Sequence, residues 1–215
     1  GGWNVDEAGA FLLEQFQTTP SCLFIVNTKK WAQELYQYCQ RQNVPPEALF
    51  HLSTNQCAAH RKAIFDTIKA RLKNKQPVIC ISTQLIEAGV DISMACVIRA
   101  LSGLDSIAQA AGRCNRHGEK KGKGQVWVLN LQEQDFTRIL PDIQAGKTHA
   151  ERVFRDFVGR DILQPEAMKR YFEYYFYNRS NEMVYPINEK AKNDGLLHWL
   201  SDNCFNRGAK FSGYL

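Results

Sequence analysis

The residues best suited to chemistry lie in one stretch, Ser82 to Gly118, which ends in a cluster of cations. Arg113 and Arg116 stand three residues apart, a spacing that predicts one shared face on a helical turn. Each guanidinium stays charged at any working pH and offers a planar fork of donors that matches phosphate oxygens. The pair therefore predicts contact with a triphosphate whose charge spreads during transfer. The alternative is a solvated basic turn that makes surface ion pairs.

Hydroxyl groups and a glycine precede the arginines. Thr83 follows the apolar run 78–81 and offers a hydroxyl and a backbone donor to phosphate oxygens. Gly89 permits an unusual backbone dihedral, and Asp91 two residues later could accept a hydrogen bond from a sugar hydroxyl. An ordinary turn is the alternative for Gly89 and Asp91 taken alone.

The elements that must position these residues alternate between strands and helices. We expect strands at 21–26, 48–52, 78–82, 95–98 and 125–131, and helices at 29–42, 57–74, 104–111, 148–158 and 165–177, with a further helical piece at 196–200. This alternation predicts crossover units and a parallel α/β sheet. Open sheets of this class bind ligands at the carboxyl ends of their strands.

Three segments are expected along the chain. Residues 1–20 form an N-terminal helix and linker, in which Ala10, Leu13 and Phe16 share a helical stripe. Residues 21–135 form the α/β domain, and residues 136–215 form a helical extension with a strongly aromatic helix.

Composition narrows the function classes. The formal net charge of +5 is compatible with a phosphate-bearing partner. The seven cysteines contain no Cys-x-x-Cys pair, so we expect reduced thiols, no metal site and a cytoplasmic protein. No apolar run is long enough to span a bilayer, so no membrane partner is expected.

Two short patterns imitate nucleotide-binding motifs. Ala145 to Thr148 resembles the end of a phosphate-binding loop, but Pro141 stands where the pattern needs glycine. We expect Thr148 to be a helix N-cap instead. Asp6 and Glu7 resemble an acidic magnesium box, but no apolar strand precedes them. The chain is therefore not expected to bind nucleotide phosphates and Mg²⁺ by itself.

The longer pattern resembles a known family. The sequence TQLIEAGVDI followed by QAAGRCNRHG is similar to motifs V and VI of superfamily 2 helicases. The segment GLDSIAQAAGRCNR, together with LSTNQCAAHR upstream, more specifically resembles the CRISPR-associated helicase–nuclease of type I interference systems. The resemblance covers about residues 21–131 and implies a second RecA-like lobe, an open parallel sheet flanked by helices, with a C-terminal helical extension.

The resemblance also implies roles for individual residues. Arg113 and Arg116 would contact the γ-phosphate, Gln109 would order that contact, and Gly89 and Asp91 would face the nucleotide. The implied contacts to the backbone of single-stranded DNA are Asn27, Thr28, Ser53, Thr54, Arg61 and Thr83. For Arg61, an ion pair on a helix surface is the alternative.

Members of this family translocate along single-stranded DNA in the 3′-to-5′ direction with ATP and Mg²⁺, and cut DNA through a separate His–Asp domain. Neither a phosphate-binding loop nor an acidic box nor a His–Asp signature stands in this chain, so the first lobe and the nuclease domain are expected elsewhere. Ser93 stands where the family often has an acid. The resemblance implies a CRISPR surveillance complex as a partner, and a moving lobe is also a target for an anti-CRISPR inhibitor.

Two other readings stay open at this stage. One is the corresponding lobe of another superfamily 2 DNA or RNA helicase. The other is a non-catalytic module that docks a partner through the aromatic helix from Tyr171 to Tyr177, although such a run is also typical of packed core.

Overall fold

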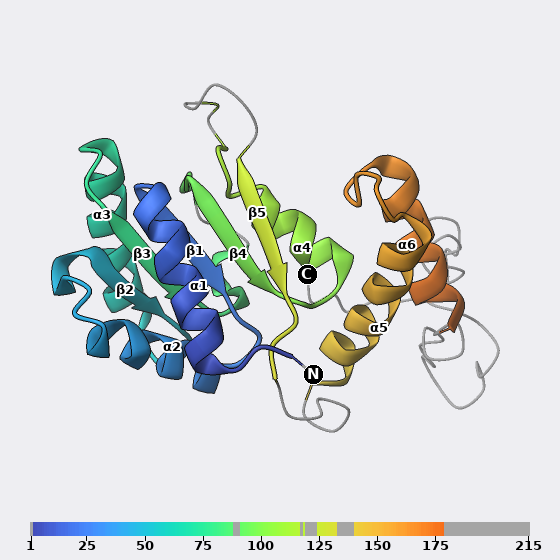
Figure 1. Ribbon diagram of the computed structural model, residues 1–215, viewed down its shortest axis with the longest axis horizontal. Coiled ribbons are helices and arrows are strands. Elements are labelled where there is room, and N and C mark those ends of the chain that lie inside the picture. The colour runs from blue at the N-terminus through green and yellow to red at the C-terminus, as the bar shows by residue number, and fades with distance from the viewer. Residues whose placement is uncertain (1, 88–90, 117, 119–123, 133–139, 179–215) are drawn as a thin grey trace, which may run out of the picture.

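Five parallel strands form one sheet in the order β2-β3-β1-β4-β5 (Figure 1). The structure, a computed structural model, describes residues 2–87, 91–116, 118, 124–132 and 140–178. The strands are β1 Ser21–Ile25, β2 Leu49–Leu52, β3 Val78–Ser82, β4 Cys96–Ala100 and β5 Gln125–Leu129. The helices are α1 Val5–Thr18, α2 Lys29–Arg41, α3 Ala58–Lys73, α4 Leu104–Ala111, α5 Pro141–Asp156 and α6 Pro165–Asn178, with short turns η1 Pro46–Ala48 and η2 Gln84–Ile86. The predicted parallel α/β sheet flanked by helices is confirmed.

The central strands are covered on both faces. Every residue of β1, β3 and β4 is buried, as expected for apolar runs in a parallel sheet. Ser21 pairs with Val78, and Cys22 pairs with Cys96, so β1 is in parallel register with both neighbours. The carboxyl ends of these strands therefore lie at one edge of the sheet.

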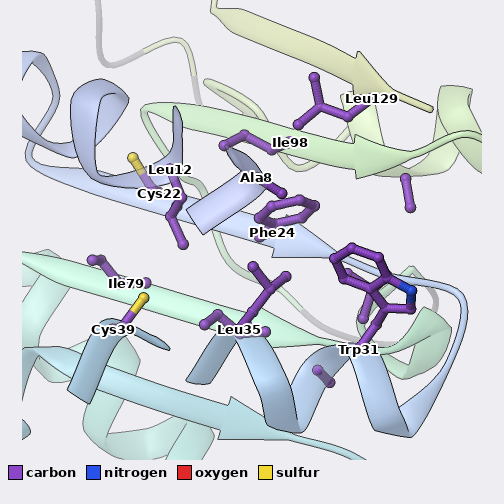
Figure 2. Close-up of a cluster of buried hydrophobic side chains, with 14 of the residues drawn as sticks. Ala8, Leu12, Cys22, Phe24, Trp31, Leu35, Cys39, Ile79, Ile98 and Leu129 are labelled. Carbon is purple, nitrogen blue, oxygen red and sulfur yellow. The ribbon is translucent and has the colours of Figure 1, made fainter. Parts of the chain in front are cut away.

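The two faces of the sheet carry separate cores, because successive side chains of a strand point to opposite faces. Figure 2 shows the first core, where Leu12 of α1 and Leu35 of α2 pack near Phe24 of β1. On the other face, Leu23 of β1 packs with Ile68 of α3. Burial of these apolar side chains is the main favourable term in folding.

Helix α1 begins with a reciprocal cap. Asn4 accepts a hydrogen bond from the backbone of Glu7 at 2.9 Å, and the Glu7 carboxylate accepts from the backbone of Asn4 at 2.8 Å. Asp6 and Glu7 therefore lie in the first turn of a helix and not behind a strand, in keeping with their rejection as a magnesium box.

The buried stripe of α1 differs from the predicted one. The buried residues are Ala8, Gly9, Leu12 and Gln15, whereas Ala10 is exposed. The prediction was therefore wrong for Ala10, whereas Leu13 and Phe16 are half-buried and pack against the first core. The polar Gln15 lies on the buried side, and its backbone carbonyl accepts a hydrogen bond from the Thr19 hydroxyl at 2.8 Å. A polar residue at this position interrupts the apolar pattern by which the buried face is recognised in the sequence.

Helix α5 begins at Pro141 and not at residue 148, about two helical turns earlier than predicted. Pro141 occupies its first turn, where a proline lacks no needed donor. Thr148 lies inside the helix and its hydroxyl donates to the Gln144 carbonyl at 3.0 Å, so the predicted N-cap at Thr148 was wrong. Ala145 to Thr148 is thus helical, which agrees with the rejection of a phosphate-binding loop. A Cβ on Gly146 would lie 3.0 Å from Gly103, so this glycine lets α5 approach the start of α4.

The aromatic helix α6 has one buried and one exposed side. Tyr171 packs in a third apolar cluster with Leu104 of α4 and Val153 of α5, and its hydroxyl donates to Asp105 at 2.9 Å. Phe172, Phe176 and Tyr177 are exposed. The predicted helical piece at 196–200 lies outside the described residues.

Two further findings concern the whole described chain. Among these residues, no helix is both long and apolar enough to cross a lipid bilayer. Among the described residues, the six cysteines form no disulfide bond with one another.

Candidate functional site

Three strands deliver polar residues to one edge of the sheet, the hydroxyl edge, which we define as Thr28, Ser53, Thr54 and Thr83. The backbone joins these loops, because the Thr83 amide donates to the Leu52 carbonyl at 3.2 Å. The sheet thus brings together four of the residues that the resemblance placed on DNA.

The members of the hydroxyl edge differ in exposure. Thr28 caps α2, and its hydroxyl accepts from the Trp31 amide at 3.2 Å. Ser53 is buried, and its hydroxyl accepts from the Asn55 amide at 3.4 Å. Thr54 is exposed and Thr83 is half-buried. A phosphate at this edge would therefore meet the Thr54 and Thr83 hydroxyls and the start of α2.

Arg61 supports the loop that carries Ser53 and Thr54. Its guanidinium donates to the Gln56 carbonyl. The Gln56 side chain in turn accepts from the Ser53 amide at 3.0 Å and donates to the His51 carbonyl at 2.9 Å. The contact described for Arg61 is thus to a carbonyl, and it holds the loop in shape.

Asn27 lies inside the protein. Its side chain donates to the Leu101 carbonyl at 2.9 Å and accepts from Arg99 at 2.6 Å. Because both ends of the amide are engaged in the interior, the structure gives Asn27 an internal role next to the hydroxyl edge. Contact of its side chain with DNA stays an untested prediction.

The two arginines of the motif lie in a turn and not on a helix. Helix α4 ends at Ala111, and Asn115 has a positive φ of 46°. The Met94 amide donates to the Arg113 carbonyl and the Asn115 amide donates to the Met94 carbonyl, both at 2.9 Å. The predicted shared helical face of Arg113 and Arg116 was therefore wrong, because pairing with Met94 unwinds the chain after α4.

Arg113 is largely buried, with 8% of its surface exposed. Its Nη2 donates to the Glu87 carbonyl at 2.6 Å, while its buried Nε has no hydrogen-bond partner among the described residues. Arg116 is different, because 42% of its side chain is exposed and its Nε lies 3.4 Å from Oδ1 of Asp91. Ion pairs this open to water contribute little stability, so Arg116 can exchange its partner readily.

Three further residues were predicted to contact the nucleotide: two lie near this turn, and one lies outside the described residues. Gln109 is exposed on α4. Asp91 faces a cavity of about 370 Å³ that is lined by Lys69, Lys73 and Lys75. These lysines make the surroundings of Asp91 positive, which suits an anionic ligand. Gly89 lies outside the described residues.

The arginine turn and the hydroxyl edge lie at opposite ends of the strands. Met94, which pairs with the arginine turn, precedes β4, whereas Thr83 follows β3. Thr83 and Met94 therefore lie at opposite ends of the sheet. A ligand at the arginine turn and a polymer at the hydroxyl edge would bind at separate places.

Sequence reasoning missed two charged residues between these ends. Arg99 is fully buried in β4, and its Nε lies 2.8 Å from Oε1 of Glu87, which is 7% exposed. Burial raises the pKa of the Glu87 carboxyl, while Arg99 and a hydrogen bond with Ser106 oppose that shift. The signal was present in the sequence, since an arginine in the run CVIRA is a charge within a buried strand. The predicted strand ended at residue 98 and so left Arg99 outside it.

These features define a class. A RecA-like parallel sheet, a hydroxyl edge and an arginine turn after the motif-V-like segment are those of a second lobe of a superfamily 2 helicase. The model of the CRISPR-associated nuclease/helicase Cas3 C-terminal family matches residues 18–119. The α/β part of the chain therefore corresponds to the Cas3 C-terminal helicase family.

Individual relatives agree with that assignment. The Cas3 nuclease/helicase of Haloferax volcanii is 53% identical over 60 residues, which are 27% of this chain and 6% of the relative. That of Methanothermobacter thermautotrophicus is 31% identical over 229 aligned positions, covering 78% of this chain and 27% of the relative. The chain thus spans about a quarter or less of the length of these curated relatives.

Solved structures share the fold. The crystal structure of T. fusca Cas3 with ADP matches with a TM-score of 0.64 at 18% identity, over 80% of this chain and 22% of that one. A chain of a CRISPR RNA-guided surveillance complex, captured before nicking, matches with a TM-score of 0.58 at 18% identity, over 81% of this chain and 24% of that one.

Proposed function

We propose that this chain is the second helicase lobe of an ATP-driven translocase that unwinds and degrades foreign DNA in CRISPR type I interference. The observation that carries the proposal is the arginine turn, in which Arg116 is partly exposed and forms an open ion pair with Asp91. Because an ion pair so open to water contributes little free energy, this guanidinium can exchange Asp91 for a γ-phosphate that another lobe presents.

The nucleotide is held mainly by the first lobe. Among the described residues, no group of three or more His, Cys, Asp or Glu side chains is placed to hold a metal ion. We assign Mg²⁺ and the triphosphate cradle to that lobe, because the family's phosphate-binding loop and acidic box are expected there. This chain contributes Arg113, Arg116 and Gln109 to the phosphate, and Asp91 with Gly89 to the sugar side.

Closure of the lobes links ATP to movement. ATP favours the closed state because its terminal charge pairs with the guanidinium groups, and hydrolysis weakens that preference. Single-stranded DNA lies along the hydroxyl edge, where Thr28, Thr54 and Thr83 contact phosphates and Ser53 and Arg61 hold the loop. Each cycle of closure then shifts the grip along the strand.

The wider assembly follows from the same assignment. We propose a cytoplasmic protein that also carries a nuclease domain and is recruited by a CRISPR surveillance complex. An anti-CRISPR inhibitor that binds this lobe and blocks closure would stop the motor. The docking-module alternative is less favoured, because Tyr171 of the aromatic helix packs inside the third apolar cluster.

The experiment is ATP turnover by the full-length protein with and without nucleic acid. Arg116→Ala is expected to lower turnover about 10³-fold, the lower end of what arginine fingers contribute. Single-stranded DNA is expected to stimulate ATP turnover by the wild-type protein, whereas RNA is not expected to do so. A matched control is Lys62→Ala, which breaks another exposed ion pair, that with Asp66 at 2.8 Å, and should leave turnover intact.

Near-normal turnover by the Arg116→Ala protein would refute the finger assignment. Stimulation by RNA in place of DNA would instead assign the lobe to another branch of the helicase superfamily.

A further inference from the structure

A buried ion pair lies between the arginine turn and the hydroxyl edge. Arg99 is fully buried, and its Nε lies 2.8 Å from Oε1 of the Glu87 carboxylate. A charge in a protein interior is costly unless it is paired and hydrogen-bonded. The partners of these two side chains therefore indicate what the pair holds in place.

On one side the pair reaches the hydroxyl edge. Nη1 of Arg99 donates to Oδ1 of Asn27 at 2.6 Å and to the Ala100 carbonyl at 2.9 Å. Asn27 also donates to the Leu101 carbonyl at 2.9 Å, so its side chain is fixed at both ends. Thr28 is the next residue along the chain, and it caps α2 at the edge that we assign to DNA.

On the other side the pair reaches the arginine turn. The backbone carbonyl of Glu87 accepts from Nη2 of Arg113 at 2.6 Å. The Glu87 carboxylate is buried and is paired with the Arg99 guanidinium. Because the side chain of Glu87 is anchored, the carbonyl that orients Arg113 is anchored too.

We propose that Arg99 and Glu87 are positioning residues that orient Arg113 and connect it through Asn27 to the hydroxyl edge. The inference rests on the proposed finger role of Arg113. A contiguous set of polar contacts in a dry interior holds its members in one geometry. A shift of Thr28 on binding DNA moves Asn27, and Arg99 and Glu87 pass that shift to the guanidinium that meets the phosphate.

The test is a double-mutant cycle in the full-length protein, with Arg99→Lys and Arg113→Ala made singly and together. Lysine keeps the charge but lacks the fork that spans Glu87 and Asn27. We expect Arg99→Lys to lower DNA-stimulated kcat for ATP about tenfold or more, with little change in KM, because the lost contact acts on the transition state. Affinity for single-stranded DNA, measured by fluorescence anisotropy, should stay at the wild-type value.

The cycle separates positioning from a general structural role. If Arg99 acts through Arg113, adding Arg99→Lys to the Arg113→Ala protein should cause no further loss of kcat. A further tenfold loss in the double variant, or normal DNA stimulation in the single Arg99→Lys variant, would overturn the inference. If Arg113→Ala alone keeps normal ATP turnover, the finger role of Arg113 is refuted. This result differs from the two outcomes that would overturn only the positioning role of Arg99.

Two controls keep the result interpretable. Arg71→Lys changes another arginine that binds a carbonyl, that of Pro77 at 3.2 Å, and lies on α3 away from the network. It should leave kcat unchanged. Thermal unfolding checks that each variant folds. If Arg99→Lys does not fold, Glu87→Gln tests the same step, since it keeps the carbonyl that Arg113 uses and removes only the charge, and the same cycle with Arg113→Ala then decides.

Discussion

At the scale of single residues, Arg113 and Arg116 differ in their surroundings although they are three positions apart. Arg113 is enclosed and bonded to a carbonyl, whereas Arg116 is open to water beside a carboxylate. A buried guanidinium is held in one orientation, while an exposed one can exchange partners. We therefore expect Arg113 to keep a fixed geometry and Arg116 to move between Asp91 and phosphate.

A histidine of the second strand predicts how stability depends on pH. His51 is half-buried, and its buried Nε2 has no hydrogen-bond partner among the described residues. Burial lowers the pKa of His51 below its usual 6.5, because the charged form is poorly solvated. The unfolded chain therefore binds a proton as pH falls through about 6.5 while the folded protein does not, so the free energy of unfolding should decrease there.

Urea denaturation at pH 8 and pH 5.5 measures this effect. His51→Gln should reduce the difference in unfolding free energy between the two pH values, and His60→Gln, which changes an exposed histidine of α3, should leave it intact. An unchanged difference in the His51→Gln protein would show that another group dominates.

At the scale of elements, α6 is attached to the sheet domain through α4 and α5. Tyr171 has 2% of its surface exposed and bonds Asp105 in the first turn of α4, while Tyr177 on the same helix is 84% exposed. The aromatic helix therefore contributes one side to the fold and presents the other to solvent.

This asymmetry predicts unequal effects of two tyrosine substitutions. Tyr171→Ala should destabilise the protein by about 3–5 kcal/mol, as large aromatic-to-alanine changes in a core do. Tyr177→Ala should change stability by about 0.5 kcal/mol or less, as is usual for surface positions. Chemical denaturation of both variants measures the difference, and equal small effects would show that α6 is peripheral and would restore the docking-module reading.

The sequence predicted the bounds of strands and helices well where turn residues or polar side chains mark both ends of the element. The apolar run Val78–Ser82 and the helix Leu104–Ala111 have the predicted bounds, because turn residues and polar side chains mark their ends. The predicted stripe of α1 was right for Leu13 and Phe16, which pack against the first core, but it wrongly included Ala10 and missed the buried polar Gln15. The start of α5 was misplaced because Thr148 was expected to be the N-cap, whereas Pro141 opens the helix.

The site was predictable in its residue types but not in its geometry. The spacing of Arg113 and Arg116 is visible in the sequence, yet the turn that separates them depends on pairing with Met94, nineteen residues before Arg113. The link between Arg99 and Glu87 also arises only when β4 and the segment after β3 meet. Contacts between residues distant in the chain are set by tertiary packing, which periodicity does not encode.

At the scale of the whole molecule, one segment connects two opposite ends of the sheet. It starts at Thr83 on the hydroxyl edge and ends at Met94 beside the arginine turn. We propose that DNA binds at the first of these ends and that nucleotide meets the second. The first helicase lobe would complete this chemistry by presenting the triphosphate across a cleft.

The most direct measurement is a structure of the full-length protein with Mg²⁺, single-stranded DNA and ADP–aluminium fluoride, a mimic of the transferring phosphoryl group. We predict that the Arg116 guanidinium leaves Asp91 and lies about 3 Å from the fluoride, the distance of a charge-assisted hydrogen bond. Arg116 still paired with Asp91 and remote from the fluoride in the closed state would contradict the finger role on which the proposed motor depends.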